Sequence, residues 1–286
     1  MIATGTHAHS IAKRRPIDVM GATFYKSEWM ECGGDPALSP TVFLVEQPPN
    51  TNLVPHFHRQ NQFQLFVDGA GSIGRESLGP ITVHYAGAYT GYGPLLSGPQ
   101  GIKYFTIRAV CEAGFTPISE AKEKMLRGPK RHANSKPVPP LTAAALAALT
   151  GTEQQTLIEP GDDGMGAHLT RLPPGAPFHP AHVRGSEGQF LFVTAGTLQG
   201  TLGGTAGGTA GGTAGGTAGG TAGGTRGAAL EGTQASGSVT PVTPVTLGRW
   251  EHLFWLAGDT APLLAAGPGG AEIVSLYIPH KEAAYV

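Results

Sequence analysis

The sequence predicts an all-β protein made of two similar β domains in tandem, joined by a short helical connector. Glycine accounts for 44 of the 286 residues and proline for 24, while charged residues make up only 14 %. This composition favours turns and short strands over long charged helices. Short apolar runs punctuated by glycine and proline fill both halves of the chain, and the two halves resemble each other.

The similarity between the halves is clearest around two landmarks. Pro48-Pro49 is matched by Pro173-Pro174, at an offset of 125 residues, and Gln62 is matched by Gln189, at an offset of 127. In each half a Pro-Pro turn is followed by a histidine-bearing segment, an apolar strand and a glycine. This order indicates duplication of one β unit.

The predicted strands are runs of β-branched, aromatic and other apolar residues. They comprise Thr41–Val45, Phe63–Val67, Ile81–Tyr85, Tyr104–Ala109, Phe190–Thr194 and Ile273–Ile278. Helical patterns lie mainly between the halves. Ile118–Leu126 ends before Gly128-Pro129, and Leu141–Leu149 begins beside Thr142, a suitable cap. Gly69–Gly74 spells G-x-G-x-x-G, but no helix pattern follows it, so we expect a hairpin there.

We expect a first domain over residues 1–136, including the connector helix, and a second over 137–286. Five copies of Thr-Ala-Gly-Gly at 205–224 cannot build a core, which predicts a disordered surface loop at 203–226. Such a loop can lengthen at small cost, because each doubling adds only about 0.6 kcal/mol.

The net charge of −1 indicates neither a nucleic-acid nor a membrane partner. No apolar run is long enough to span a bilayer, and the N-terminus lacks the apolar core of a signal peptide. Cys32 and Cys111 do not form a disulfide scaffold. They are interpreted as reduced thiols, which predicts a cytoplasmic protein.

His56 and His58 carry the strongest functional signal. Residues i and i+2 of a strand point to the same face, so the two imidazoles project together, and Gln62 follows with the same parity. Imidazole suits zinc, iron, copper, nickel and manganese ions. The spacing therefore predicts that His56, His58 and Gln62 form a metal site, with Gln62 as third ligand or as a group behind the ligands.

The pattern His56-x-His58-x₃-Gln62-x₆-Gly69 resembles the first motif of the cupin superfamily, in which glutamate is common at the position of Gln62. With the duplication, the chain resembles a two-domain cupin, or bicupin. The resemblance implies two small jelly-roll barrels, a divalent transition metal (Fe, Mn, Ni, Cu or Zn) and dioxygenase-like oxidoreductase chemistry at the first barrel. It also implies a homodimer and a small-molecule substrate.

Two departures weigh against a metal. The family's second motif places a further histidine about ten residues after a glycine, and none follows Gly87 at that spacing, although His84 could substitute if its strand turns it inward. In the second half, His179 and His182 do not reproduce the pair. The alternatives are therefore a metal-free small-molecule binder or isomerase-like protein, and a structural or storage-like bicupin.

A polar pocket is predicted from Gln64, which shares a strand face with Gln62, and from Tyr85 and Tyr92, which are placed to line its mouth. These three are the predicted substrate-binding residues. The alternative is that Gln64 faces solvent at a sheet edge and that the tyrosines are ordinary strand aromatics.

Overall fold

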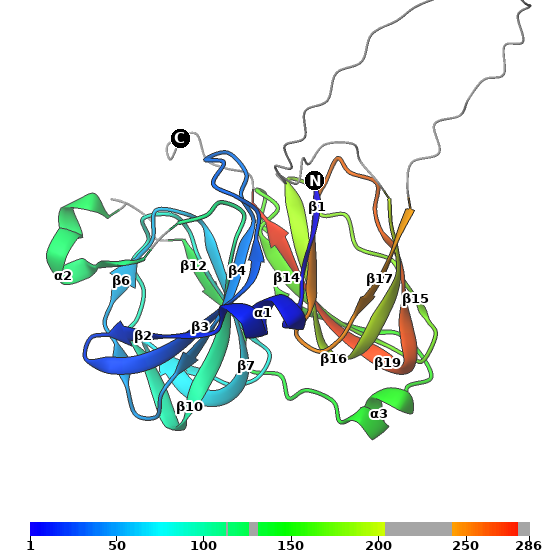
Figure 1. The fold of residues 1–286 in the computed structure, drawn as a ribbon, viewed down its shortest axis with the longest axis horizontal. Helices are drawn as coiled ribbons and strands as arrows, with labels where there is room; N and C mark the ends of the chain where they lie inside the picture. The colour runs from blue at the N-terminus through cyan, green and yellow to red at the C-terminus, as the bar shows by residue number, and fades with distance from the viewer. Residues whose placement is uncertain (113, 126–130, 204–241, 280–286) are drawn as a thin grey trace, which may run out of the picture.

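Two β-barrels lie side by side in the computed structural model, which describes all residues except 113, 126–130, 204–241 and 280–286 (Figure 1). The first is built mainly from the N-terminal half of the chain and the second mainly from the C-terminal half. The predicted all-β class and two-barrel organisation are confirmed. Each of the six predicted strands overlaps an observed strand, although Ile81 and Ala109 lie just outside theirs.

The first barrel is a nine-stranded antiparallel sheet with the order β12-β9-β7-β10-β4-β3-β2, to which β5 and β8 add at β10 and β7. Its strands are β2 (Arg15–Val19), β3 (Ala22–Glu31), β4 (Thr41–Gln47), β5 (Asn52–Leu53), β7 (Gln62–Ile73), β8 (Glu76–Leu78), β9 (Thr82–Ala86), β10 (Leu95–Arg108) and β12 (His132–Asn134). A separate pair, β6 (His56–Phe57) and β11 (Thr116–Pro117), lies beside it. The expected hairpin at Gly69–Gly74 is the β7–β8 turn.

The second barrel is an eight-stranded antiparallel sheet with the order β1-β18-β16-β19-β14-β13, to which β15 and β17 add at β19 and β16. Its strands are β1 (Ile2–Gly5), β13 (Glu153–Ile158), β14 (Gly166–Leu172), β15 (Pro177–Phe178), β16 (Gly188–Gly203), β17 (Val242–Leu247), β18 (His252–Leu256) and β19 (Leu263–Ile278). The predicted loop at 203–226 lies outside the described residues apart from Gly203, which ends β16.

The helices are short. The predicted helix at 118–126 is α2 (Ile118–Ala121) followed by the 3₁₀ turn η1 (Lys122–Lys124), and the predicted helix at 141–149 is α3 (Ala143–Ala147). Thr142 caps α3 as expected, because its hydroxyl accepts from the Ala145 amide. The sequence did not predict α1 (His7–Lys13), which begins at a similar cap, Thr6, whose hydroxyl accepts from His9. None of the helices in the described part of the chain is long and apolar enough to cross a membrane.

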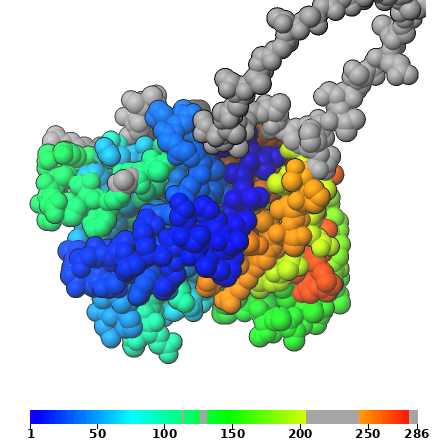
Figure 2. Space-filling model, viewed as in Figure 1, coloured from blue at the N-terminus to red at the C-terminus, as the bar shows by residue number. Residues whose placement is uncertain are grey.

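The first strand crosses the expected domain division. β1 pairs with β18, from Ile2 opposite Trp255 to Gly5 opposite His252, and thus belongs to the second barrel. The chain then passes through α1 into the first barrel, so the N-terminal segment lies across the join between the two (Figure 2). Residues 1–136 are therefore not a self-contained unit, because their first strand is hydrogen-bonded to the C-terminal half.

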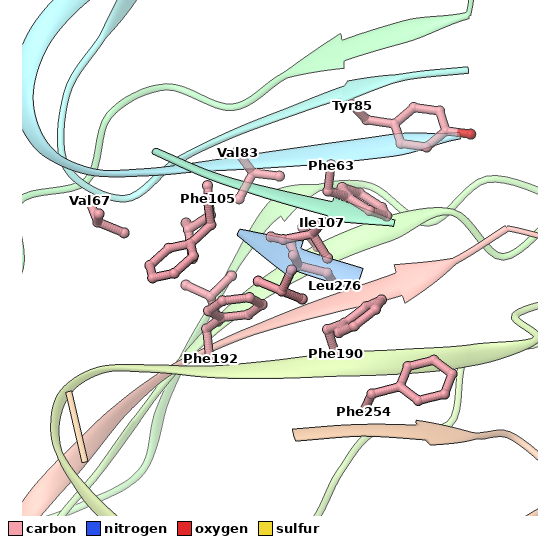
Figure 3. Close-up of a cluster of buried hydrophobic side chains, with 14 of the residues drawn as sticks. Phe63, Val67, Val83, Tyr85, Phe105, Ile107, Phe190, Phe192, Phe254 and Leu276 are labelled. Carbon is pink, nitrogen blue, oxygen red and sulfur yellow. The ribbon is translucent and has the colours of Figure 1, made fainter. Parts of the chain in front are cut away.

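The barrels pack against each other through one large apolar cluster (Figure 3). Alternate residues of β7, among them Phe63 and Leu65, face outward from the first barrel, yet they are 3 % and 0 % exposed because the second barrel covers them. Phe105 and Phe192 meet there with ring centroids 5.3 Å apart. Each residue of β7 from 62 to 67 is therefore buried, on one face inside the barrel and on the other between the barrels.

The two barrel interiors differ in polarity. Leu191 and Val193 of β16 belong to the apolar core of the second barrel. By the 127-residue offset their counterparts in the first barrel are Gln64 and Phe66, so a buried glutamine replaces a leucine. Buried amides need hydrogen-bond partners, which makes the interior of the first barrel the candidate site.

Candidate functional site

His56 and His58 are held inside the first barrel by β6 and the segment opposite it. The backbone of His56 exchanges two hydrogen bonds with that of Tyr92, N–O 3.1 and 3.0 Å. Both histidines are buried, 2 % and 8 % exposed, and their ring centroids are 5.3 Å apart. The predicted convergence of the two imidazoles is therefore observed.

Gln62, at the start of β7, is bound by Arg108, the last residue of β10. Arg108 Nε and Nη2 donate to Gln62 Oε1 at 3.0 and 2.6 Å, and Nη2 also lies 2.9 Å from His58 Nδ1. Nη1 donates to the Glu112 carbonyl at 2.7 Å. Arg108 is only 2 % exposed, so a guanidinium is buried between two of the three predicted metal ligands.

The hydrogen bonds run in one direction away from Arg108. A guanidinium only donates, so His58 Nδ1 and Gln62 Oε1 must accept, and the Gln62 amide nitrogen is left to donate to Tyr92 Oη at 2.8 Å. The hydroxyl proton of Tyr92 then faces His56 Nε2 at 2.9 Å. His56 Nδ1 lies 2.7 Å from the Val54 carbonyl and must carry the ring proton. Each hydrogen bond in this series therefore pairs a donor with an acceptor.

Tyr92 lies at the centre of three histidines. Its ring centroid is 4.5 Å from that of His56, 4.7 Å from that of His84 and 6.2 Å from that of His58. His84 does point inward and is 1 % exposed, with Nδ1 2.7 Å from Asn134 Oδ1. Its Nε2 has no hydrogen-bond partner among the described residues.

The three histidines are neutral at physiological pH. Burial, together with the positive charge of Arg108, lowers the pKa of His56 to about 4. Burial likewise lowers the pKa of His84 to about 4, and burial followed by the Arg108 charge brings the pKa of His58 well below its usual range. Burial raises the pKa of the Tyr92 hydroxyl.

A cavity of about 310 Å³ opens onto this network. Its polar lining includes His56, His58, Gln62, Gln64 and Tyr92. Its apolar lining comes mainly from β2, β3, β4 and β5 and includes Ile17, Val19, Phe24, Phe43, Val45 and Leu53. The space suits a small organic molecule with a polar end and an apolar body.

Of the three predicted substrate-binding residues, two line the cavity and one does not. Gln64 and Tyr92 line it, and Gln64 is 2 % exposed, so it does not face solvent. Tyr85 is elsewhere, and that prediction is wrong. Because neighbouring residues of a strand point to opposite faces, the inward direction of His84 turns Tyr85 outward, where it packs on Phe63 in the cluster between the barrels.

Sequence analysis missed Arg108 and Glu112. The carboxylate of Glu112 accepts from the backbone amides of Arg59 and Gln60, at 2.9 to 3.2 Å, and its residue lines the cavity. One signal was available for Arg108, because it lies in the predicted strand Tyr104–Ala109 with the same parity as Tyr104 and Thr106. A charged residue in that position needs a buried partner.

No family model matches the sequence, and no curated protein matches it. Among solved structures, a deletion variant of oxalate decarboxylase from Bacillus subtilis matches with a TM-score of 0.53 and 9 % identity, over 96 % of this chain and 77 % of that one. A candidate dioxygenase from Nostoc punctiforme matches with a TM-score of 0.53 and 10 % identity, over 99 % and 81 %. The chain has the bicupin fold. At such low identity the bicupin likeness concerns the fold and not the activity.

Another structure of Bacillus subtilis oxalate decarboxylase, 8 % identical to this chain, is described as that of a protein with Mn(II) centres. In the present chain, His56, His58 and Gln62 do not fit a divalent ion as they are arranged. His56 Nε2 accepts from Tyr92, whereas His58 Nδ1 and Gln62 Oε1 accept from a permanently charged guanidinium. Charges of +2 and +1 about 5 Å apart repel by roughly 7 kcal/mol at an effective dielectric constant of about 20.

Clusters of three or more histidine, cysteine, aspartate or glutamate residues able to hold a metal are also absent from the described ranges. The second barrel offers even less. Its cavity is about 80 Å³ and is lined by His182 and Gln189, the counterpart of Gln62. The absence of a second His-x-His pair, noted in the sequence, agrees with this smaller and simpler interior.

Proposed function

We propose that the first barrel of this bicupin is a metal-independent binding site for a small, mainly apolar organic molecule. The observation that carries the proposal is the Arg108 guanidinium, which binds the acceptor atoms of His58 and Gln62 that a metal would need. The cavity of about 310 Å³ supplies the space for the molecule, whereas the pocket at the second barrel has a volume of about 80 Å³.

The pKa values of Tyr92 and His56 do not favour an acid–base enzyme. The proton between Tyr92 and His56 stays on Tyr92, because the hydroxyl has a raised pKa while that of His56 is about 4. The network is better suited to fixing the directions of its donors and acceptors than to exchanging protons.

The metal-dependent, dioxygenase-like oxidoreductase is the second candidate. It is favoured by His56 and His84, whose Nδ1 atoms lie against carbonyl oxygens, as those of metal-ligating histidines commonly do. The bicupin neighbours also favour it, since one is described as a candidate dioxygenase and another as a protein with manganese centres. This candidate requires Arg108 and Tyr92 to leave their present positions.

Metal analysis separates the two candidates. We expect the untagged protein to carry no stoichiometric metal by plasma mass spectrometry, before or after incubation with Fe²⁺, Mn²⁺ or Zn²⁺. The double variant Gln62→Glu/Arg108→Met supplies a carboxylate and removes the cation, so it should gain a metal. Gln189→Glu, the same change in the second barrel, is the control. About one ion per chain in the parent, lost in His56→Ala, would establish the second candidate.

Binding is tested directly by isothermal titration with EDTA present. The probes are 1-octanol, its isomer 1-methoxyheptane, and octanoate. We expect at least one of them to bind, and binding to be lost in Val19→Trp, which fills the cavity. Val19 and Val245 are both half-buried strand valines, one in each barrel, so Val245→Trp is the matched control. Failure of all three probes to bind the parent would refute the proposed binding site.

A further inference from the structure

Gln64 has an unused hydrogen-bonding atom at the wall of the cavity. Its side chain is 2 % exposed and lines the cavity, yet its Oε1 has no partner among the described residues. Leaving such a group unpaired typically costs about 1–3 kcal/mol. The neighbouring Gln62, on the same face of β7, shows the opposite state, because both atoms of its amide are hydrogen-bonded.

A second unpaired acceptor lies beside the first. His84 on β9 is directly opposite Gln64 in the strand register, and opposite residues of an antiparallel pair share a face with Cβ atoms about 5 Å apart. The Asn134 carbonyl oxygen faces His84 Nδ1, which therefore carries the ring proton. Nε2 is then a bare acceptor, buried and without a partner among the described residues. The two acceptors form one polar rung inside the barrel, in which Gln64 is the member that lines the cavity.

The charges around the cavity indicate what kind of donor fits. Arg108 and the lining residues Arg15 and Lys26 are positive, and the last two share a single carboxylate, Glu28, at 2.7 and 2.9 Å. The other carboxylate, Glu112, already accepts from backbone amides. An ammonium group would meet this excess of positive charge, whereas an uncharged hydroxyl would not.

We propose that the unpaired acceptors of Gln64 and His84 select an uncharged, mainly apolar ligand that carries a hydroxyl group. This inference rests on the proposed function, because it names the ligand class of the same site. The hydroxyl donates to the rung formed by Gln64 and His84, and the apolar body lies along Phe24, Phe43 and Val45. The second barrel lacks this specificity, since leucine stands at the position that corresponds to Gln64.

The test compares two isomers that differ in one respect. 1-Octanol and 1-methoxyheptane have the same atoms, but only the alcohol has an O–H donor. With EDTA present, we expect the alcohol to bind the parent protein at least tenfold more tightly. Gln64→Leu and, separately, His84→Leu should each weaken alcohol binding while leaving the Kd of the ether within twofold. Gln155→Leu, the same change on an exposed strand of the second barrel, should alter neither.

Three other outcomes would each contradict part of the proposal. Equal affinities for the alcohol and the ether in the parent would overturn the ligand class while leaving the proposed binding site intact. Tighter binding of octanoate than of 1-octanol would also overturn it, because recognition would then come from the cations. An alcohol preference that survives in both leucine variants would remove the assigned role of the rung. The comparison of isomers in the parent needs no variant, so a variant that fails to fold leaves the test standing.

Discussion

At the scale of single residues, Arg108 determines what the first barrel can bind. Its guanidinium makes four hydrogen bonds, to Gln62, His58 and the Glu112 carbonyl, and from these contacts the orientation of each later member of the network follows. A glutamate in place of Gln62 would form an ion pair with Arg108, whereas glutamine accepts from Arg108 and still donates to Tyr92. The glutamine is thus matched to the arginine.

The Tyr92 hydroxyl links Gln62 to His56 within this network. Tyr92→Phe should lower the free energy of unfolding by about 1–3 kcal/mol, because the Gln62 amide and His56 Nε2 both lose their partner while buried. Urea unfolding followed by circular dichroism measures the change. Tyr25→Phe, at a tyrosine that is 37 % exposed, should change it by less than about 0.5 kcal/mol. Equal effects would contradict the role given to Tyr92.

At the scale of elements, β1 joins the barrels because glycine lets it approach β18 closely. A Cβ placed on Gly5 would lie 1.9 Å from His252 Nε2. His252 is fully buried and stacks on Phe192 at a centroid distance of 4.4 Å, so its ring has little room to move. A side chain at position 5 would therefore displace either the strand or the ring.

This contact can be tested by a pair of substitutions. Gly5→Ala should destabilise the protein by about 1–3 kcal/mol through overpacking. In a background of His252→Ala the same change should cost much less, giving a coupling energy above about 0.5 kcal/mol. Gly34→Ala, where no atom lies within 4 Å of the added Cβ, is the control. Additive effects of Gly5→Ala and His252→Ala would show that the two positions are not in contact.

The strands and the helix α1 differ in how directly the sequence predicts them. The strand runs are mainly apolar, as strands buried on both faces are, and each predicted run overlaps an observed strand. The helix α1 was missed because its seven residues, His7–Lys13, have no apolar stripe. It is held by the Thr6 cap and by its contacts with β3, which depend on the fold.

At the scale of the whole molecule, the two barrels form one folding unit. They share the apolar cluster around Phe105 and Phe192, and the second sheet takes its first strand from the N-terminus. A fragment of residues 137–286 would expose the outward face of its barrel, including Phe190, Phe192 and Phe254, and would lack β1. We expect this fragment to aggregate or to lack a cooperative thermal transition by calorimetry. A monodisperse, cooperatively folded fragment would contradict this.

The stability of the whole protein should fall between about pH 6.5 and pH 4. His56, His84 and His252 each have a pKa of about 4 because of burial, so the unfolded chain binds more protons than the folded one in this interval. Stability is full above about pH 6.5 and is lost as the pH falls, by up to about 3 kcal/mol for each histidine at pH 4. Urea midpoints at half-unit steps of pH measure the slope.

His252 allows one part of this dependence to be isolated. Its ring is packed among Trp29, Phe105 and Phe192, its Nδ1 faces the Trp250 carbonyl at 3.1 Å, and none of these neighbours carries a charge. In His252→Phe the fall in stability between pH 6.5 and pH 4 should be smaller by up to about 3 kcal/mol. An unchanged slope would show that His252 is not buried in its neutral form.

The sequence by itself determined the all-β class, the duplication, most strands, and the meeting of His56, His58 and Gln62, because strand periodicity and spacing are local properties. Tertiary structure alone decided which face of β7 is inside, since both faces are buried and periodicity cannot distinguish a barrel interior from the join between barrels. It also decided what the site contains. Arg108 is 46 residues from Gln62 along the chain, and only the pairing of β10 with β7 brings its charge to the predicted metal ligands.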